Sequence, residues 1–304
     1  MLSGEKILIT GAAGGVASPI TRQLAKHNEV WGVARFTDPK DRQKLEAMGV
    51  RCVRKDLGRD TLDDLPDDFT YVFHAAAVGN ADLGPDWPYS YEVNAQGTAR
   101  LMYHCRKAKG FLSCSTTIVY DPFAPQPVTE KTPVGQHIHH YSLSKIAGEQ
   151  LVTFISNEFK VPATILRIAS FYGRAAGGVS RRVQSLVEGK EITLHSDRPN
   201  YFNPIFEDDA VELGVKAMAL ARTPPLVVNF GGDVVVSAEE YLAFAGDLTG
   251  KKPKLVYTDK TFRGMKIDVT YMHQVLGHCK VHWKDGVREV LKANYPRMPL
   301  RVVE

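Results

Sequence analysis

Short apolar segments with strand character alternate with helical patterns along the first half of this chain. The strand patterns are apolar almost throughout, which is typical of strands that are covered on both faces. This alternation predicts an α/β protein with a doubly wound parallel sheet. The strand patterns lie at 6–10, 30–34, 50–53, 71–75, 111–114 and 163–168, and the helical ones at 19–27 and 41–48 and from near Tyr91 and Tyr141.

A turn rich in small residues joins the first strand to the first helix and places Gly11, Gly14 and Ala17 at intervals of three. Small residues let the backbone approach a pyrophosphate, and the helix beyond supplies free N–H groups and the positive end of its dipole. A glycine cluster directly after an N-terminal strand and before a helix predicts a dinucleotide site in a Rossmann-like sheet, against the alternative of a structural tight turn.

The second strand ends in Ala34 and Arg35, where the ribose of the adenosine is usually recognised. An acidic side chain there accepts a hydrogen bond from the 2′-hydroxyl, whereas an arginine accommodates a 2′-phosphate. Ala34 removes the acid and Arg35 supplies the cation, which favours NADP(H) over NAD(H). The alternative is a surface arginine that stacks on the adenine with either cofactor.

Tyr141 and Lys145 are four residues apart in a predicted helix and therefore point the same way. A phenol has an ordinary pKa of about 10, and a nearby ammonium favours the phenolate and lowers that value. The pair can thus move a proton to or from a substrate oxygen near neutral pH. Without supporting motifs the same two residues would indicate only a helix surface.

Further motifs follow in a fixed order: Asp56-Leu57, His74-Ala75-Ala76-Ala77, Val93-Asn94-Ala95, the run from Ser113 to Tyr120, Leu166-Arg167-x-x-Ser170-x-Tyr172-Gly173, and Asn203-Pro204-Ile205. With the glycine turn and the Tyr141 pair, this series resembles the extended short-chain dehydrogenase/reductase family in its epimerase/dehydratase-like branch, over nearly the whole chain. Thr116 precedes Tyr141 by 25 residues, a spacing typical of that branch. Gly15 replaces an aromatic and Ser170 an asparagine that are usual in the family.

The resemblance implies roles for individual residues. Tyr141 would be the acid/base, Lys145 would lower its pKa and bind the nicotinamide ribose, Thr116 would hydrogen-bond the substrate oxygen, and Asn94 would support the proton relay. Cofactor binding would involve Gly11, Ala13, Gly14, Gly15, Val16, Arg35, Asp56, Leu57, Ala75, Ala76, Ala77, Tyr141, Lys145 and Ala169. Substrate binding would involve Thr117, His140, Ser170 and Tyr201.

The implied activity is hydride transfer at an alcohol or carbonyl carbon by an NAD(P)-dependent oxidoreductase, and the alternative is a nucleotide-sugar epimerase that retains its cofactor. Thr117 stands where the related dehydratases carry an acid, which argues against dehydration. The segment Asn200-Tyr201-Phe202 replaces an arginine usual in the epimerases, which weakens a nucleotide-sugar substrate. A sensor without catalysis is disfavoured because it would not need the Thr116–Tyr141–Lys145 set.

Two interwoven lobes are expected, with residues 1–173 and about 203–231 binding the dinucleotide and about 174–202 and 232–304 binding the substrate.

A net charge of +4 without a basic run argues against nucleic acid, and no long apolar segment indicates a membrane span. Four scattered cysteines suit a cytoplasmic protein. No metal is expected, because the histidines at 137–140 lack accompanying ligands. The family implies a homodimer through the helices that begin near Tyr91 and Tyr141, and a small-molecule substrate.

Overall fold

The computed structural model describes residues 2–79, 87–135 and 139–303. The chain divides into two compact units. The first contains residues 1–121, 133–167 and 211–228, and the second contains 122–132, 168–210 and 229–304. The predicted lobe boundaries concern which ligand each part binds, and they stay a prediction.

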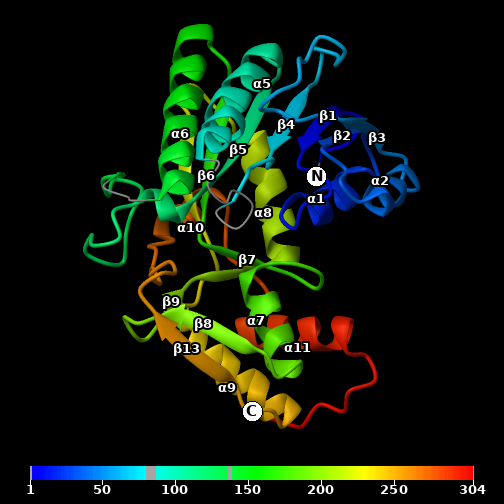
Figure 1. The fold of residues 1–304 in the computed structure, drawn as a ribbon. Coiled ribbons are helices and arrows are strands. Elements are labelled where there is room, and N and C mark those ends of the chain that lie inside the picture. The colour runs from blue at the N-terminus through cyan, green and yellow to red at the C-terminus, as the bar shows by residue number, and fades with distance from the viewer. Residues whose placement is uncertain (1, 80–86, 136–138, 304) are drawn as a thin grey trace. The chain divides into compact units, whose positions relative to one another are not determined.

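A seven-stranded sheet in the order β11-β6-β5-β4-β1-β2-β3 forms the centre of the first unit (Figure 1). The pairs β1·β2, β1·β4, β2·β3 and β4·β5 are parallel. The predicted doubly wound α/β fold is therefore confirmed. The strands are β1 Lys6–Thr10, β2 Glu29–Ala34, β3 Arg51–Arg54, β4 Tyr71–His74, β5 Gly110–Thr116, β6 Ala163–Ile168 and β11 Leu226–Phe230.

Helices cover both faces of this sheet because alternate residues of its strands point to opposite sides. Leu8 and Val72 pack in one core with the helices α5 and α6. On the other face, Phe73 and Ile20 of α1 lie against Gly214 of α8. The helices of this part are α1 Ala17–Leu24, α2 Pro39–Glu46, α4 Trp87–Tyr91, α5 Thr98–His104, α6 His140–Phe159 and α8 Glu207–Ala219.

The helix predicted to begin near Tyr91 is interrupted. Between α4 and α5 the chain forms a π-helical segment, η1, over Glu92–Gly97. Such a segment carries one extra residue per turn and occurs frequently at functional sites.

Among its described residues the second unit has four complete helices and three small sheets. β7 Ser170–Tyr172 pairs in parallel with β10 Pro204–Phe206, β8 Glu191–His195 in parallel with β13 Lys254–Thr258, and β9 Tyr201–Phe202 antiparallel with β12 Val236–Ser237. Leu186, Leu242 and Leu291 meet in its core from α7 Gly178–Val187, α9 Ala238–Thr249 and α11 Trp283–Asn294. The short helix α10 spans Thr270–Val275. Among the described residues no helix is long and apolar enough to cross a membrane.

Candidate active site

The glycine turn brings the end of β1 against the end of β4. Gly11 has a φ of +66°, and a Cβ there would lie 2.9 Å from the backbone nitrogen of Ala76. Only glycine adopts this conformation and this close approach without strain. Gly15 and Val16 complete the turn before α1, and no side-chain hydrogen bond from Val16 caps the helix. The N–H groups of Gly11 and Gly14 donate to the Val33 and Gly11 carbonyl oxygens at 2.7 Å each, so an anionic ligand would have to use N–H groups nearer to the start of α1.

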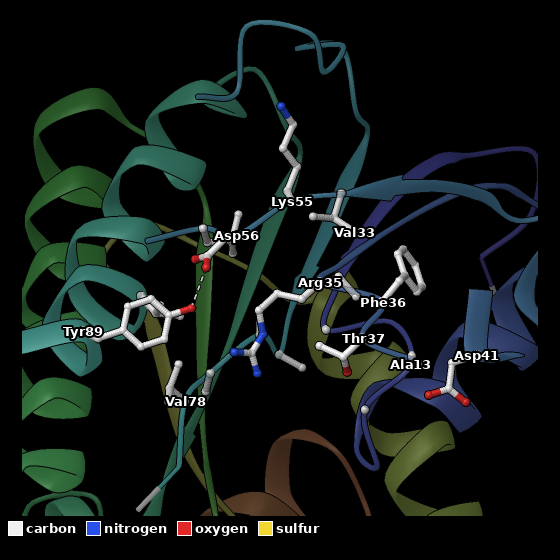
Figure 2. Close-up of a pocket in the computed structure, with 18 residues that line it drawn as sticks. Ala13, Val33, Arg35, Phe36, Thr37, Asp41, Lys55, Asp56, Val78 and Tyr89 are labelled. Carbon is white, nitrogen blue, oxygen red and sulfur yellow. Dashed lines mark hydrogen bonds between the residues drawn. The ribbon is translucent and has the colours of Figure 1, made fainter. Parts of the chain in front are cut away.

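A pocket opens above this turn and contains most of the predicted cofactor residues (Figure 2). Gly15, Val16, Tyr141, Lys145 and Ala169 are not part of its lining. The predicted residues that line it are Gly11, Ala13, Gly14, Arg35, Asp56, Leu57, Ala75, Ala76 and Ala77. Ala34, which the sequence placed beside Arg35 at the ribose position, also lines the pocket, and the predicted set did not include Val33, Phe36, Thr37, Asp41, Lys55, Val78, Tyr89 and Val93. Several of these residues stand directly beside a predicted residue at the end of a strand, for example Phe36 beside Arg35 and Lys55 beside Asp56. Their position at a strand end was therefore the sequence signal that could have identified them.

Arg35 and Tyr89 face each other across the pocket, and Figure 2 shows the Arg35 side chain pointing into it. The Tyr89 hydroxyl donates a hydrogen bond to Asp56 Oδ2 at 2.7 Å. Burial, followed by this bond to Asp56, raises the pKa of Tyr89, while Arg35 acts in the opposite sense. Tyr89 was missed because it lies far from Asp56 in the sequence.

Thr116 and Tyr141 contact each other at the carboxyl end of β5. Thr116 is the last residue of that strand and is buried. A side-chain hydrogen bond with Thr116 lowers the pKa of Tyr141, but burial has the larger effect and raises it to about 12. The two predicted catalytic residues are thus brought together, with Thr116 buried and Tyr141 partly exposed.

Lys145 lies one helical turn after Tyr141 on α6 and is fully enclosed. Its Nζ donates to the carbonyl oxygen of Cys114 at 2.7 Å. Burial lowers the pKa of Lys145 itself. In this structure burial dominates the pKa of Tyr141 and the Lys145 ammonium is directed at β5, so the lowering of the Tyr141 pKa by Lys145 stays a prediction.

Asn94 lies in η1 and connects three parts of the site. Its side-chain nitrogen donates to Ser144 Oγ on α6 and to the Val78 carbonyl, each at 3.0 Å. Its oxygen accepts from the Val78 N–H at 2.9 Å. The close approach of α6 depends on Gly148, since a Cβ there would lie 2.5 Å from the Asn94 carbonyl oxygen. A glycine inside a helical pattern was the signal for this contact.

A buried ionic network fixes α6 to the sheet. Glu149 forms a salt bridge of 2.7 Å with Arg167 of β6 and accepts a hydrogen bond from Ser115 of β5. Arg167 also donates to the Tyr120 hydroxyl at 3.0 Å. Burial opposes the charge of the guanidinium, but the hydrogen bond and charge of Glu149 prevail and raise the pKa of Arg167. Because Glu149 follows Lys145 by one turn, the network holds the face of α6 that carries Lys145 toward β5.

The predicted substrate residues lie in both units. Thr117 follows β5 in a short 3₁₀ turn and is buried. His140 begins α6, and its buried Nε2 has no hydrogen-bond partner among the described residues. Ser170 and Tyr201 lie in β7 and β9 of the second unit, together with the predicted cofactor residue Ala169. His137 lies outside the described residues, whereas His139 directly precedes α6.

A parallel sheet with a pyrophosphate turn, and a Thr–Tyr–Lys set at the end of its β5 strand, define a nicotinamide-dinucleotide-dependent enzyme of the extended short-chain dehydrogenase/reductase type. The model of the NAD dependent epimerase/dehydratase family matches residues 7–231. The chain belongs to this family.

Known relatives are similar over most of their length. An uncharacterized UDP-glucose epimerase of Bacillus subtilis is 27% identical over 84% of this chain and 85% of its own. A UDP-N-acetyl-alpha-D-glucosaminuronate decarboxylase of Bacillus cytotoxicus is 24% identical over 95% of this chain and 97% of its own. The solved UDP-glucuronic acid 4-epimerase of Bacillus cereus, in complex with UDP-glucuronic acid and NAD, superposes with a TM-score of 0.83 at 24% identity and covers 95% of this chain and 100% of its own. This last similarity supports the fold.

Proposed function

We propose that this enzyme transfers hydride at a secondary alcohol carbon of a nucleoside-diphosphate sugar, with Tyr141 as the acid/base. The observation that carries the proposal is the hydrogen-bonded pair of Thr116, at the end of β5, and Tyr141, which lies one helical turn before Lys145 on α6; β5 belongs to the sheet that also carries the pocket. The substrate class comes from the relatives, whose names refer to UDP-sugars.

Each residue of the set has a separate task in this proposal. The bound nicotinamide supplies the hydride acceptor and donor. Tyr141 takes the hydroxyl proton when the alcohol becomes a ketone, and it returns that proton when the ketone is reduced. Thr116 hydrogen-bonds the substrate oxygen while charge develops on it. Lys145 binds the nicotinamide ribose, and Asn94 holds Ser144 and α6 in position.

Two net reactions use this chemistry. Reduction of the ketone on its other face gives epimerisation with the cofactor retained, and the curated epimerase that matches 84% of this chain favours it. Release of the ketone gives a net oxidoreductase, and Ser170 and the Asn200–Phe202 segment favour an oxidoreductase on a substrate other than a nucleotide sugar, because they replace residues that are usual where such a sugar binds. We propose epimerisation first, on the strength of that relative.

Substitution of Tyr141 tests the assignment. Tyr141→Phe should reduce turnover by about 10²–10⁴-fold, because the acid/base is removed. Cofactor affinity should change less than about twofold, since the ring and its packing remain. UDP-glucose and UDP-glucuronic acid, each with NAD or NADP, are followed by product chromatography and by NAD(P)H absorbance, with Tyr103→Phe on α5 as the matched control. A Tyr141→Phe enzyme with near-wild-type turnover would contradict the role of Tyr141.

The same measurements separate the two net reactions. Interconversion of the sugars without net change in NAD(P)H absorbance supports epimerisation. Absorbance that changes in step with product supports the oxidoreductase and rejects epimerisation.

Three further properties are part of the proposal. We propose NADP(H) as the preferred cofactor, supported by Arg35 in the pocket and by Ala34 in place of an acid.

We propose a homodimer through α5 and α6, supported by exposed apolar side chains on these helices. A cytoplasmic location is supported by four unpaired cysteines, the state expected of thiols in a reducing compartment.

A further inference from the structure

Three side chains of the second unit converge although they are distant in the sequence. Asp233 follows β11 in the loop that begins with Gly231 and Gly232. His273 lies on α10, and His278 follows that helix after Gly277, whose φ of +100° reverses the chain. The ligand atoms of the three side chains all lie within 4.8 Å of one another.

Both imidazoles direct a ring nitrogen at the same carboxylate. Nε2 of His273 lies 2.9 Å from Asp233 Oδ1, and Nδ1 of His278 lies 3.1 Å from Asp233 Oδ2. The two rings are stacked, with centroids 3.9 Å apart and an interplanar angle of 31°. Two nitrogens and a carboxylate are therefore directed at one small volume.

The carboxylate is held in place from behind, which is how proteins orient a metal ligand. The backbone N–H of Cys279 donates to Asp233 Oδ1 at 3.2 Å. Asp209 adds negative charge nearby, since the charges of Asp209 and Asp233 both raise the pKa of the Cys279 thiol. The Asp209 carboxylate in turn accepts the backbone N–H groups of Lys280 and Val281 at 2.8 and 3.0 Å. The segment after α10 is thus fixed around a concentration of negative charge.

We propose that Asp233, His273 and His278 bind one divalent transition-metal cation, with zinc as the best match. Two neutral imidazole nitrogens and one carboxylate oxygen are a ligand set that suits zinc, and three protein ligands leave a coordination position for water. The cation takes the place of the protons that now join the rings to the carboxylate. The site is separate from the hydride-transfer residues, which belong to the first unit.

The site also has a structural consequence. The bound cation joins the loop after β11 to α10 and to the segment that follows it, across 40 and 45 residues of sequence. A ligand that binds only the folded chain stabilises it by mass action. Zinc should therefore raise the melting temperature of the protein.

Metal titration of the whole enzyme tests this site. After treatment with a chelator and its removal, zinc is titrated against a chromophoric competitor, and cobalt(II) absorption reports the ligand field. We expect one zinc per chain and a tetrahedral cobalt(II) spectrum. His278→Gln, at a side chain that is 69% exposed, should fold normally and weaken zinc binding at least about tenfold.

Matched variants make the result specific. Asp233→Asn keeps the shape of the side chain but loses its charge, and it should also weaken zinc binding and abolish the melting shift. His27→Gln, at an exposed histidine of the first unit, should bind zinc as the wild type does. Wild-type protein without zinc binding would overturn the proposal and leave a purely hydrogen-bonded His–Asp–His cluster. Equal binding by the wild type, His278→Gln and Asp233→Asn would overturn it as well, because the metal would then lie elsewhere. Neither outcome bears on the role of Tyr141.

Discussion

At the scale of single residues, Arg35 decides the cofactor in our proposal. Its guanidinium points into the pocket, and two parallel hydrogen bonds from it fit the oxygens of a 2′-phosphate. Charge-assisted hydrogen bonds contribute about 1.5–3 kcal/mol each. Arg35→Ala should therefore raise the Kd for NADPH by about tenfold or more, and it should change the Kd for NADH much less. Isothermal titration with both cofactors measures the two values.

Two variants control for non-specific effects of this substitution. Arg35→Lys retains the charge without the planar fork and should give an intermediate loss for NADPH. Arg51→Ala removes an exposed arginine of the neighbouring strand β3, outside the pocket lining, and should leave both affinities unchanged. Equal losses for NADPH and NADH in Arg35→Ala would remove the preference.

At this scale the place of a residue can be predicted from the sequence where it follows from local position, while its role as a cofactor ligand stays a prediction. Gly11 and Arg35 line the pocket because each stands at the end of a strand of a parallel sheet. The protonation of Tyr141 could not be predicted in this way. Its pKa depends on how the folded chain buries the phenol, and that burial raises the pKa to about 12.

At the scale of elements, the contact between α6 and η1 sets the geometry of the catalytic helix. Gly148 lets the two backbones meet, and Asn94 then hydrogen-bonds Ser144, three residues after Tyr141. The strands of this sheet are predicted well because their short segments are apolar almost throughout. The π-helical turn has no such pattern in the sequence, so a continuous helix was expected there instead.

Gly148→Ala tests this contact. Alanine normally stabilises a helix interior relative to glycine by about 1 kcal/mol. Here its Cβ would lie 2.5 Å from the Asn94 carbonyl oxygen, so one backbone must move. We expect the free energy of unfolding to fall by about 1–3 kcal/mol, the range for overpacking, and turnover to fall as Ser144 is displaced. Urea unfolding and the sugar assay measure the two effects.

Gly214→Ala is the matched control, since Gly214 is also a buried glycine within a helix. Its Cβ would meet only Ile20 and Phe73 at 3.7 and 3.8 Å, which are ordinary contacts. This variant should gain up to about 1 kcal/mol of stability and keep its activity. If both variants were stabilised, the close approach of α6 to η1 would not limit the site.

At the scale of the whole molecule, the order of motifs was sufficient to predict the fold class. Motifs such as the glycine turn after β1 and the run that ends β5 mark the ends of successive strands of one parallel sheet. The second unit carried less information. Asp233, His273 and His278 come together through loops whose course no local pattern specifies, whereas the histidines near Tyr141 are neighbours in the sequence. Clusters of this kind follow from tertiary packing alone.

The proposed dimer is the prediction that belongs to this scale. Leu143 and Phe154 are eleven residues apart on α6 and so share a face, with exposed fractions of 37% and 58%. Phe159 extends this apolar surface to Tyr103 of α5, whose ring centroid is 5.0 Å away. Phe154→Glu should place a charge in the interface and shift the protein from dimer to monomer in sedimentation experiments, because an unpaired buried charge is costly. Leu220→Glu, at an exposed apolar residue just after α8, should leave the dimer intact. A wild-type chain that sediments as a monomer, or a Phe154→Glu variant that remains dimeric, would show that this surface is not the interface.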